Sequence, residues 1–219
     1  MQFDPATMLW RRVELGLLKK KWSRYFNGKI LDLGCGEGEI AKDVFDKQID
    51  WGLDNDPEMI KKAKKSKVYK KVLLASAIDI PLKDNTVDLV FSNSVLEHIP
   101  NITQVLKEVK RVLKPSGELI ITMPSHQLSN YLGLGELYGK LFNHKYCHYH
   151  LYSLPSWKKL LLKHNLKVID SYYYLDKETI GKWHKLLWLN KLGIKTKSAP
   201  ITPKILKMGA GITIRAKKI

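Results

Sequence analysis

Hydrophobic residues along this chain form short, mainly apolar runs that alternate with amphipathic stretches. The run Ile30–Leu33 leads directly into glycines, and this combination predicts a buried strand followed by a turn and a helix. After residue 100, apolar residues recur with the 3.6-residue spacing of a helix that Asn101 or Thr103 can cap; they are Val105, Leu106, Val109 and Val112. The alternation continues to Met123 and predicts an α/β core.

Residues 5–26 are expected to form a helix before this core. Pro5 stands in its first turn, where proline is tolerated, and apolar residues follow at helical intervals: Trp10, Val13, Leu17 and Trp22. Farther along, Lys114–Gly117 has the composition of a turn.

The residues from Asp32 to Gly38 follow the pattern acidic-x-G-x-G-x-G, and Asp54 lies twenty residues after Gly34. Glycines at such a turn let the backbone approach a ligand that a Cβ would keep away. An acidic residue at the end of the next strand can accept hydrogen bonds from both ribose hydroxyls of a nucleotide. The spacing predicts an adenosine site at the carboxyl edge of a parallel sheet. It does not fit a dinucleotide fingerprint, because Glu39 stands where the third glycine of G-x-G-x-x-G is needed.

This compact pattern resembles motif I of S-adenosylmethionine-dependent methyltransferases, and four other segments resemble the same family: Ile80–Asn93, Val95–Ile99, Val109–Ile121 and Gly211–Lys218. The resemblance points to the type-11 (UbiE-like) branch of class I and covers about residues 28–123, 150–175 and 210–218. It implies a Rossmann-like, doubly wound α/β fold. The expected sheet is mostly parallel and seven-stranded, with helices on both faces and an antiparallel strand near the C-terminus. One domain is expected over residues 1–219, with a cap helix at 1–26 and a cofactor-binding core at 28–123.

The resemblance also implies the cofactor, S-adenosyl-L-methionine, and the residues that hold it. Those expected to wrap its methionine and ribose parts are Asp32, Gly34, Cys35, Gly36 and Gly38. Asp54 is expected to hold the ribose hydroxyls, with Asn55 beside the adenine and Met59 packing near it.

The family commonly places an aspartate after strand three, where it meets the adenine amino group. Ser76 and Ala77 stand at that position in this chain, so a hydroxyl and a backbone amide are expected to contact the adenine instead. Ser92, Asn93 and Ser94 are expected at the end of strand four, near the methionine part.

Composition indicates a folded globule, since 44% of the residues are hydrophobic and 10% aromatic. Cys35 and Cys147 lie far apart in the sequence and are interpreted as free thiols in a reducing cytoplasm. The N-terminal region does not show a signal-peptide pattern, and no run of 18 apolar residues is present.

The formal net charge of +17 is unevenly distributed and favours anionic partners. Lys61–Lys71 contains seven lysines, which are interpreted as the solvated face of a helix. After Glu178 the chain has no acidic residue, while ten lysines and arginines follow among large apolar residues. This last stretch is interpreted as a surface that meets an anionic partner.

Two segments exceed what the minimal fold needs, and both are expected to build the acceptor pocket and its lid. Residues 124–150 carry apolar residues that are expected on one broad helical face: Leu128, Tyr131, Leu132, Leu134, Leu137, Tyr138, Leu141 and Phe142. Residues 176–209 combine lysines with Trp183 and Trp188, followed by Pro200 and Pro203. The two tryptophans are expected to enter a lipid interface while neighbouring lysines meet anionic headgroups.

Histidines are the candidate bases, because an unperturbed imidazole titrates near neutrality. His98 matches the "EH" of the family, and His150 precedes a segment that resembles the family's entry into the following helix. His144, Cys147, His148 and His150 also form a dense group of donors, at a spacing that zinc ligands can have. No second paired motif supports a metal site, so none is predicted.

The favoured function is methyl transfer to a small-molecule or lipid-linked acceptor by in-line displacement, with oxygen, nitrogen and carbon acceptors all kept open. The first alternative is methylation of RNA, which the charge favours. Nucleic acid is the less favoured acceptor because Ser92–Val95 stands where exocyclic-amine methylases carry N-P-P-[FY]. The second alternative is a cofactor-binding protein without turnover, against which the intact glycine pattern and Asp54 argue. The expected location is the cytoplasm, with peripheral contact to the inner face of the membrane.

Overall fold

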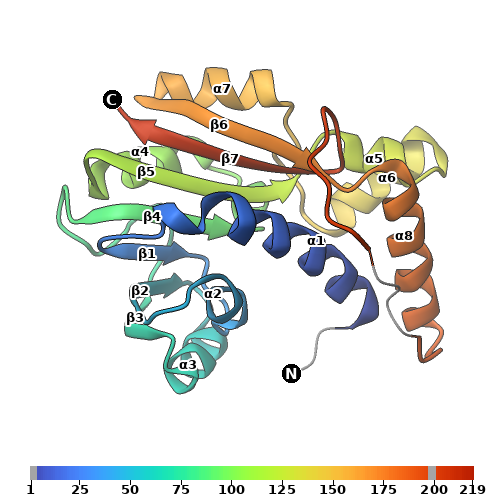
Figure 1. Cartoon of the computed structure of the whole chain (residues 1–219), viewed down its shortest axis with the longest axis horizontal. Coiled ribbons are helices and arrows are strands. Elements are labelled where there is room, and N and C mark those ends of the chain that lie inside the picture. The colour runs from blue at the N-terminus through green and yellow to red at the C-terminus, as the bar shows by residue number, and fades with distance from the viewer. Residues whose placement is uncertain (1–3, 197–200) are drawn as a thin grey trace.

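The structure, a computed structural model, describes residues 4–196 and 201–219. Within these residues seven strands form one sheet in the order β3-β2-β1-β4-β5-β7-β6 (Figure 1). The strands are β1 (Ile30–Leu33), β2 (Ile49–Asp54), β3 (Tyr69–Leu74), β4 (Val87–Asn93), β5 (Leu113–Pro124), β6 (Leu166–Tyr174) and β7 (Gly211–Lys218). Strand β7 is antiparallel to both of its neighbours, whereas the pairs from β3 to β5 are parallel. The predicted mostly parallel sheet with one antiparallel strand near the C-terminus is confirmed.

Helices cover both faces of the sheet, as predicted for a doubly wound fold. They are α1 (Pro5–Trp22), α2 (Glu39–Val44), α3 (Pro57–Ser66), α4 (Ile102–Val112), α5 (Gln127–Tyr131), α6 (Gly135–Lys145), α7 (Leu154–Lys163) and α8 (Lys177–Lys191), with short 3₁₀ turns η1 (Ser23–Tyr25) and η2 (Leu96–His98). Successive residues of a strand point to opposite faces, so Ile30 joins the core formed with α1 and α2, while Leu31 joins the core formed with α4 and α7. Strands buried on both faces explain why their sequences are almost continuously apolar.

Local capping signals fix the starts of α1 and α4. The Asp4 carboxylate accepts the backbone N–H of Ala6 at 2.9 Å, and Pro5 occupies the first turn of α1. Of the two candidate caps for α4, Asn101 is the residue that accepts a backbone N–H, from Gln104 at 3.2 Å.

The stretch Lys114–Gly117 is not a turn between elements but an irregularity within β5. Leu113 pairs with Val87 of β4, and the next pair on the same edge joins Glu118 to Leu89. The intervening residues therefore bulge out of the ladder, and Ser116 has a positive φ of 61°.

The prediction of one broad apolar helical face over residues 124–150 was wrong. Gly133 and Gly135 have φ of 75° and 84°, and this left-handed backbone separates α5 from α6. The apolar residues consequently divide between two surfaces. Leu128 and Phe142 are buried, whereas three leucines on the other side of α6 are exposed: Leu134 (57%), Leu137 (72%) and Leu141 (59%).

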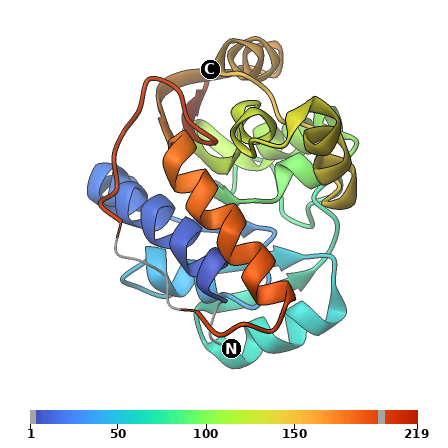
Figure 2. The same cartoon turned by 90° about the vertical axis from the view of Figure 1, so that its right-hand side faces the viewer.

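Helix α1 lies across the carboxyl ends of the central strands and beside α8 (Figure 2). A fully buried carboxylate, that of Glu14, anchors it there. Glu14 accepts hydrogen bonds from the hydroxyls of Thr122 at 2.7 Å and Tyr174 at 2.5 Å, and it pairs with Arg11 one turn away. Burial opposes ionisation of Glu14, but the Arg11 guanidinium and the two hydroxyls outweigh it and lower its pKa.

The segment 176–209 contains α8 and, near its end, a residue that pairs with β6. Asp176 caps α8 by accepting the backbone N–H of Thr179 at 2.8 Å, and Leu206 forms an isolated bridge with Tyr173. Residues 197–200, which include the predicted Pro200, lie outside the described residues.

We predict that Tyr174→Phe lowers the free energy of unfolding by roughly 1–3 kcal/mol, because Glu14 then loses a donor inside the core. Tyr172→Phe is a matched control on the same strand. Its hydroxyl is buried without a hydrogen-bond partner in the described part of the chain, so its loss should be nearly neutral. Denaturant unfolding measures both values. Equal losses for the two variants would contradict the anchoring role of Glu14.

Candidate active site

The glycine turn after β1 is held against β2 by two backbone hydrogen bonds. The N–H groups of Gly34 and Cys35 donate to the Leu53 carbonyl at 2.8 and 2.9 Å. Gly34 has φ of +78°, and a Cβ there would lie 2.2 Å from Val95. The turn therefore needs glycine for both its conformation and its packing.

Asp54 lies at the carboxyl end of β2, beside this turn. Its carboxylate accepts the N–H of Gly36 at 2.9 Å and that of Asp56 at 3.0 Å, which fixes its orientation. Each carboxylate oxygen keeps further acceptor capacity. Asp54 lines a cavity of about 360 Å³ together with Asn55, Ser76 and Ala77, so four residues that were predicted to meet the nucleoside part of a ligand lie around one cavity.

Asp32 lies under the turn and faces a second cavity of about 510 Å³, which Gly34, Cys35 and Gly36 also line. Its carboxylate is buried and accepts the Tyr69 hydroxyl at 2.7 Å. Burial raises the pKa of Asp32 to about 7, although the Tyr69 hydroxyl acts in the opposite direction. Burial also raises the pKa of the Cys35 thiol, so this cysteine is a neutral wall of the cavity and not a nucleophile.

Arg11 connects the N-terminal helix to the end of β4. Its guanidinium donates to the Asn93 side-chain oxygen at 2.6 Å and to the Ser94 hydroxyl at 3.1 Å, while Glu14 balances its charge. The Asn93 side-chain amide nitrogen is buried and has no hydrogen-bond partner among the described residues. Since Arg11 and Asn93 both line the 510 Å³ cavity, they offer N–H donors to an anionic or carbonyl group there.

A third cavity, of about 240 Å³, adjoins the other two and is mainly aromatic and apolar. We call it the aromatic pocket; its lining residues are Thr7, Trp10, Arg11, Ser94, Glu97, His98, Pro124, Leu128, Phe142, Tyr146, His148, Trp183 and Leu187. It shares Arg11 with the 510 Å³ cavity, and it shares Ser94 and His98 with the 360 Å³ cavity. Both segments that exceed the minimal fold contribute to it.

Glu97 is the exceptional residue of the aromatic pocket. Its side chain is buried, and neither carboxyl oxygen has a hydrogen-bond partner among the described residues. The nearest ring nitrogen of His98 lies 3.6 Å away. Burial raises the pKa of Glu97 to about 8, and the Arg11 guanidinium only partly offsets this.

Several predicted residues lie elsewhere or have other partners. Both ring nitrogens of His150 are engaged, by the Tyr152 hydroxyl at 3.0 Å and the Ile99 carbonyl at 2.8 Å, and His150 lines none of these three cavities. The geometry therefore favours a structural role for it. The Ser92 hydroxyl donates to the Leu33 carbonyl at 2.8 Å inside the sheet, so Ser92 supports the site from below.

The remaining predicted residues have more peripheral positions. Gly38 begins α2 with φ of +90°, and Met59 is half-buried on α3 outside the three cavities. His98 is exposed, and its ring lies 5.1 Å from that of His148. Trp183 was expected to face solvent and contact lipid. Instead it packs on Trp10, with ring centroids 5.3 Å apart.

Sequence reasoning missed Arg11, Glu14 and Glu97 as site residues. Arg11 and Glu14 sit on an amphipathic helix, where charged residues ordinarily face solvent, and only the tertiary contact with β4 to β6 reveals their role. Glu97 stands beside His98 in a segment that the resemblance had already singled out. A glutamate that directly follows the apolar residues Val95 and Leu96 was the available signal for it.

His144, Cys147, His148 and His150 lie close together in the sequence, but they are not grouped as a set of metal ligands in space. Across residues 4–196 and 201–219, no three or more side chains of His, Cys, Asp or Glu are grouped so as to hold a metal ion. Over the same residues, no helix combines the length and the apolar character needed to cross a membrane.

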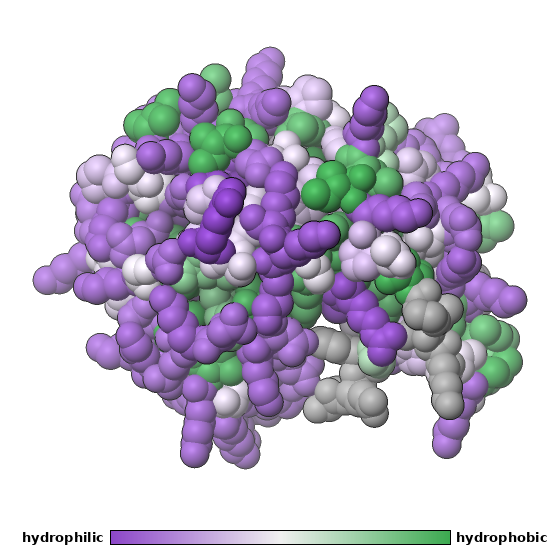
Figure 3. Space-filling view, viewed as in Figure 1, coloured by the Kyte–Doolittle hydropathy of each residue, from purple (hydrophilic) through white to green (hydrophobic). Residues whose placement is uncertain are grey.

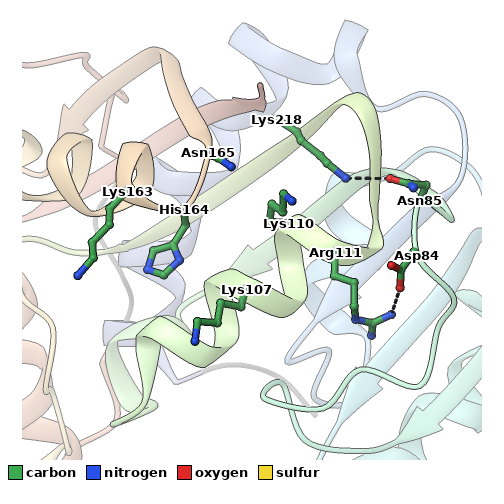
Figure 4. A pocket seen from close by; sticks show the side chains of 9 residues that line it. All are labelled: Asp84, Asn85, Lys107, Lys110, Arg111, Lys163, His164, Asn165 and Lys218. Carbon is green, nitrogen blue, oxygen red and sulfur yellow. Dashed lines mark hydrogen bonds and ion pairs between the residues drawn. The ribbon is translucent and has the colours of Figure 1, made fainter.

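A separate cavity of about 410 Å³ lies at the opposite, amino edge of the parallel strands (Figure 4). It is basic, and its lining residues include Lys107, Lys110, Arg111, Lys163 and Lys218. Several of these lie in the last turns of α4 and α7, where cations stabilise the helix carbonyl ends. This cavity contains none of the predicted ligand-binding residues.

Comparison with known proteins agrees with this geometry. Residues 31–121 match the model of a family described as a methyltransferase domain, of type 11. Demethylmenaquinone methyltransferase of Lactobacillus johnsonii is 32% identical over 181 residues, which cover 78% of this chain and 66% of that protein. An uncharacterized protein of Methanocaldococcus jannaschii is 39% identical over 119 residues, or 54% of each chain. The chain spans about half the length of several curated relatives that it matches.

A solved structure shares the whole architecture. The crystal structure of a methyltransferase dependent on S-adenosylmethionine from Thermotoga maritima superposes with a TM-score of 0.71. The two chains are 21% identical, and the match covers 98% of this chain and 91% of the other. At this identity the likeness establishes the fold.

We predict that Glu97→Gln stabilises the protein increasingly as pH rises from 5 to 8. The unfolded glutamate loses its proton near its ordinary pKa of 4.5, whereas the folded one keeps it up to about 8. The wild type therefore loses stability across this window, by an amount on the order of a few kcal/mol, and the glutamine variant does not.

Glu108→Gln is the control of opposite sign. The pKa of Glu108 is lowered, chiefly by the hydrogen bonds from Arg111. Replacing this carboxylate should therefore reduce the stability of the protein at neutral pH. Denaturant unfolding at pH 5 and pH 8 provides the comparison. A Glu97→Gln effect that is the same at both pH values would contradict the raised pKa.

Proposed function

We propose that this chain, which belongs to the class I S-adenosylmethionine-dependent methyltransferase family of the UbiE-like type, transfers a methyl group to a small-molecule acceptor. The observation that carries the proposal is the meeting of three cavities at the carboxyl edge of the sheet. Two of them fit the two ends of S-adenosylmethionine, and the third is the aromatic pocket. Gly34, Arg11 and Ser94 lie where these cavities join.

The residues present fit the cofactor. Asp54 has acceptor capacity for ribose hydroxyls, and Asn55, Ser76 and Ala77 surround the space for adenine. A Cβ at Gly36 would meet nothing within 4 Å, so the turn leaves room for a ligand against its backbone.

The 510 Å³ cavity fits the methionine end. The unpartnered Asn93 amide and the Arg11 guanidinium can bind a carboxylate there, and Asp32 offers a polar wall close to the glycine turn. When bound, the cofactor supplies a methyl group activated by a sulfonium. The protein orients the acceptor in line with that group and excludes water.

The acceptor enters the aromatic pocket under this proposal. The L. johnsonii relative is named for demethylmenaquinone, and a quinone-type small molecule suits a pocket lined by Trp10, Phe142 and Trp183. The described parts of segments 124–150 and 176–209 act as its walls and lid, residues 4–26 act as the cap, and the described residues form one domain.

RNA is a weaker candidate for the acceptor. The strongest concentration of lysines around a cavity lies at the amino edge of the sheet, on the side opposite to the aromatic pocket. Base methylation would need a basic path to the aromatic pocket itself. A protein without turnover is also disfavoured, since the pocket for an acceptor adjoins the cofactor cavities.

A lipid-linked acceptor is supported by an apolar surface beside the pocket. Exposed residues on α6 and around the end of α8 form it: Leu134, Leu137, Leu141, Trp188, Leu192 and Ile194. Lys145, Lys185 and Lys191 are exposed on the same two helices. In Figure 3, apolar side chains interrupt a mostly hydrophilic surface at the margin where Figure 1 draws α6 and α8. We propose that this surface rests on an anionic membrane and that the protein works at the cytoplasmic face.

We predict that Asp54→Ala weakens binding of S-adenosylhomocysteine by roughly 5- to 150-fold, since the ribose hydroxyls lose a charged acceptor worth about 1–3 kcal/mol. Titration calorimetry on the full chain measures the affinity. Asp84→Ala, at the opposite edge, is the control and should bind like the wild type. NAD and NADP should not compete. Unchanged affinity in Asp54→Ala would refute the cofactor assignment.

We predict stronger co-sedimentation with vesicles containing phosphatidylglycerol than with pure phosphatidylcholine, because each lysine near an anionic leaflet contributes about 1 kcal/mol. Added salt should reduce this binding. The double variant Leu137→Ser, Leu141→Ser should lose most of it.

Leu162→Ser is the matched control, since Leu162 is 55% exposed on α7 but far from α6 in the fold. It should bind vesicles like the wild type. Equal pelleting with neutral and anionic vesicles, insensitive to salt, would remove the membrane contact from the proposal.

A further inference from the structure

No hydrogen bond within the described residues explains the position of the buried Glu97 carboxyl, and the His98 ring nitrogen is 3.6 Å away from it. The Glu97 side chain is 1% exposed, and both oxygens are without hydrogen bonds among the described residues. Leaving such a group unsatisfied costs free energy of folding. By contrast, the neighbouring buried carboxylate of Glu14 is fully engaged by Arg11, Thr122 and Tyr174. Glu97 therefore has the properties of a residue that meets a ligand.

The pocket around Glu97 is shaped for a flat, apolar ligand. Aromatic rings follow one another around it, with centroids 5.3 Å apart for Trp10 and Trp183, 6.0 Å for Trp183 and Phe142, and 4.5 Å for Phe142 and Tyr146. Such rings favour stacking or edge contacts with another aromatic ring. Glu97 is the acidic residue in this lining, so it meets the polar group of that ligand.

The charged groups that face Glu97 indicate which polar group the ligand carries. The groups able to titrate or carry charge around it are Arg11 and Glu14 on α1, His98 beside it, and Tyr146 and His148 across the pocket. The Arg11 guanidinium lines the pocket itself, which disfavours a cationic amine and favours a negative charge that develops on the ligand. His148 stays neutral near pH 7, because burial lowers its pKa to about 4.

Resting on the proposed function, we propose that Glu97 is the general base of the methyl transfer and that the acceptor is an aromatic molecule with an ionisable hydroxyl. The acceptor O–H bond breaks and an O–H bond forms on a carboxylate oxygen of Glu97. The electron pair stays on the acceptor oxygen, next to the Arg11 guanidinium and the Ser94 hydroxyl. This oxygen, or the ring carbon conjugated with it, is then the nucleophile for the activated methyl group.

Charge balances in this step. Carboxylate and neutral hydroxyl give a neutral carboxylic acid and an oxyanion, and the oxyanion becomes neutral when it gains a methyl cation equivalent. Where carbon is the nucleophile, the proton on that carbon returns to the oxygen through solvent. A neutral amine acceptor would need no such base, because its nitrogen already has a free electron pair. The raised pKa of Glu97, about 8, suits proton abstraction near neutral pH.

Three naphthalene probes with the same ring and different polar groups test the proposal. They are 2-naphthol, which has a proton to give, 2-methoxynaphthalene, which has none, and 2-naphthylmethylamine, which is cationic. Binding to the full chain saturated with S-adenosylhomocysteine is followed by calorimetry between pH 6.5 and 8.5. The variants are Glu97→Gln, which keeps the size of the side chain, and Asp84→Asn, which removes a carboxylate at the opposite edge of the sheet.

The wild type is expected to bind 2-naphthol about tenfold more tightly than 2-methoxynaphthalene at pH 8, as for a hydrogen bond to a charged group. Its affinity for 2-naphthol should rise with pH as Glu97 ionises, since the hydroxyl donates to the carboxylate form. Glu97→Gln should lose both the preference and the pH dependence, while Asp84→Asn keeps both.

Several results would overturn the proposal. These are equal binding of the hydroxyl and methoxy probes, preference for the amine, or an unchanged preference in Glu97→Gln. Failure of all three probes to bind while S-adenosylhomocysteine binds normally would also overturn it, and would leave the cofactor assignment intact. Failure of S-adenosylhomocysteine itself would instead refute the proposed function.

Discussion

The buried pair of Arg11 and Glu14 is the constraint on which the site depends. A carboxylate without solvent is tolerable only if cations and donors satisfy it. Glu14 obtains them from its own helix and from hydroxyls at the ends of β5 and β6, and this fixes α1 across the edge of the sheet. Arg11 is thereby held against the end of β4, where it lines both the cavity beside the glycine turn and the aromatic pocket.

Two buried glutamates near this edge have pKa values shifted in opposite directions by their surroundings. Glu14 has three donors, and its pKa is lowered despite complete burial. Glu97 has no donor among the described residues, and burial raises its pKa to about 8. One carboxylate therefore holds the fold together at neutral pH, while the other is a neutral acid that ionises close to neutrality. Such a separation of pKa values is typical of sites that move protons.

The family resemblance made the mostly parallel sheet predictable. Local signals made the glycine turn and the cap of α4 predictable, because Gly34, Asp54 and Asn101 act through neighbours in sequence or on the adjacent strand. Contacts between distant segments were not predictable in the same way. The prediction of one helical face over 124–150 did not include the break at Gly133. His150 was predicted to be a catalytic base, but both of its ring nitrogens have structural partners. The role of Glu97 depends on a pocket assembled from four segments far apart in the chain.

In the proposed binding mode, the cofactor occupies the two cavities that meet at Gly34, and the acceptor occupies the aromatic pocket beside Arg11. A crystal structure of the full chain with S-adenosylhomocysteine tests it most directly. We expect the ribose hydroxyls to bind Asp54, the amino-acid end to lie beside Arg11 and Asn93, and the sulfur atom to face the aromatic pocket. The ligand bound in the basic cavity near Lys110, or with its sulfur turned away from the aromatic pocket, would contradict it.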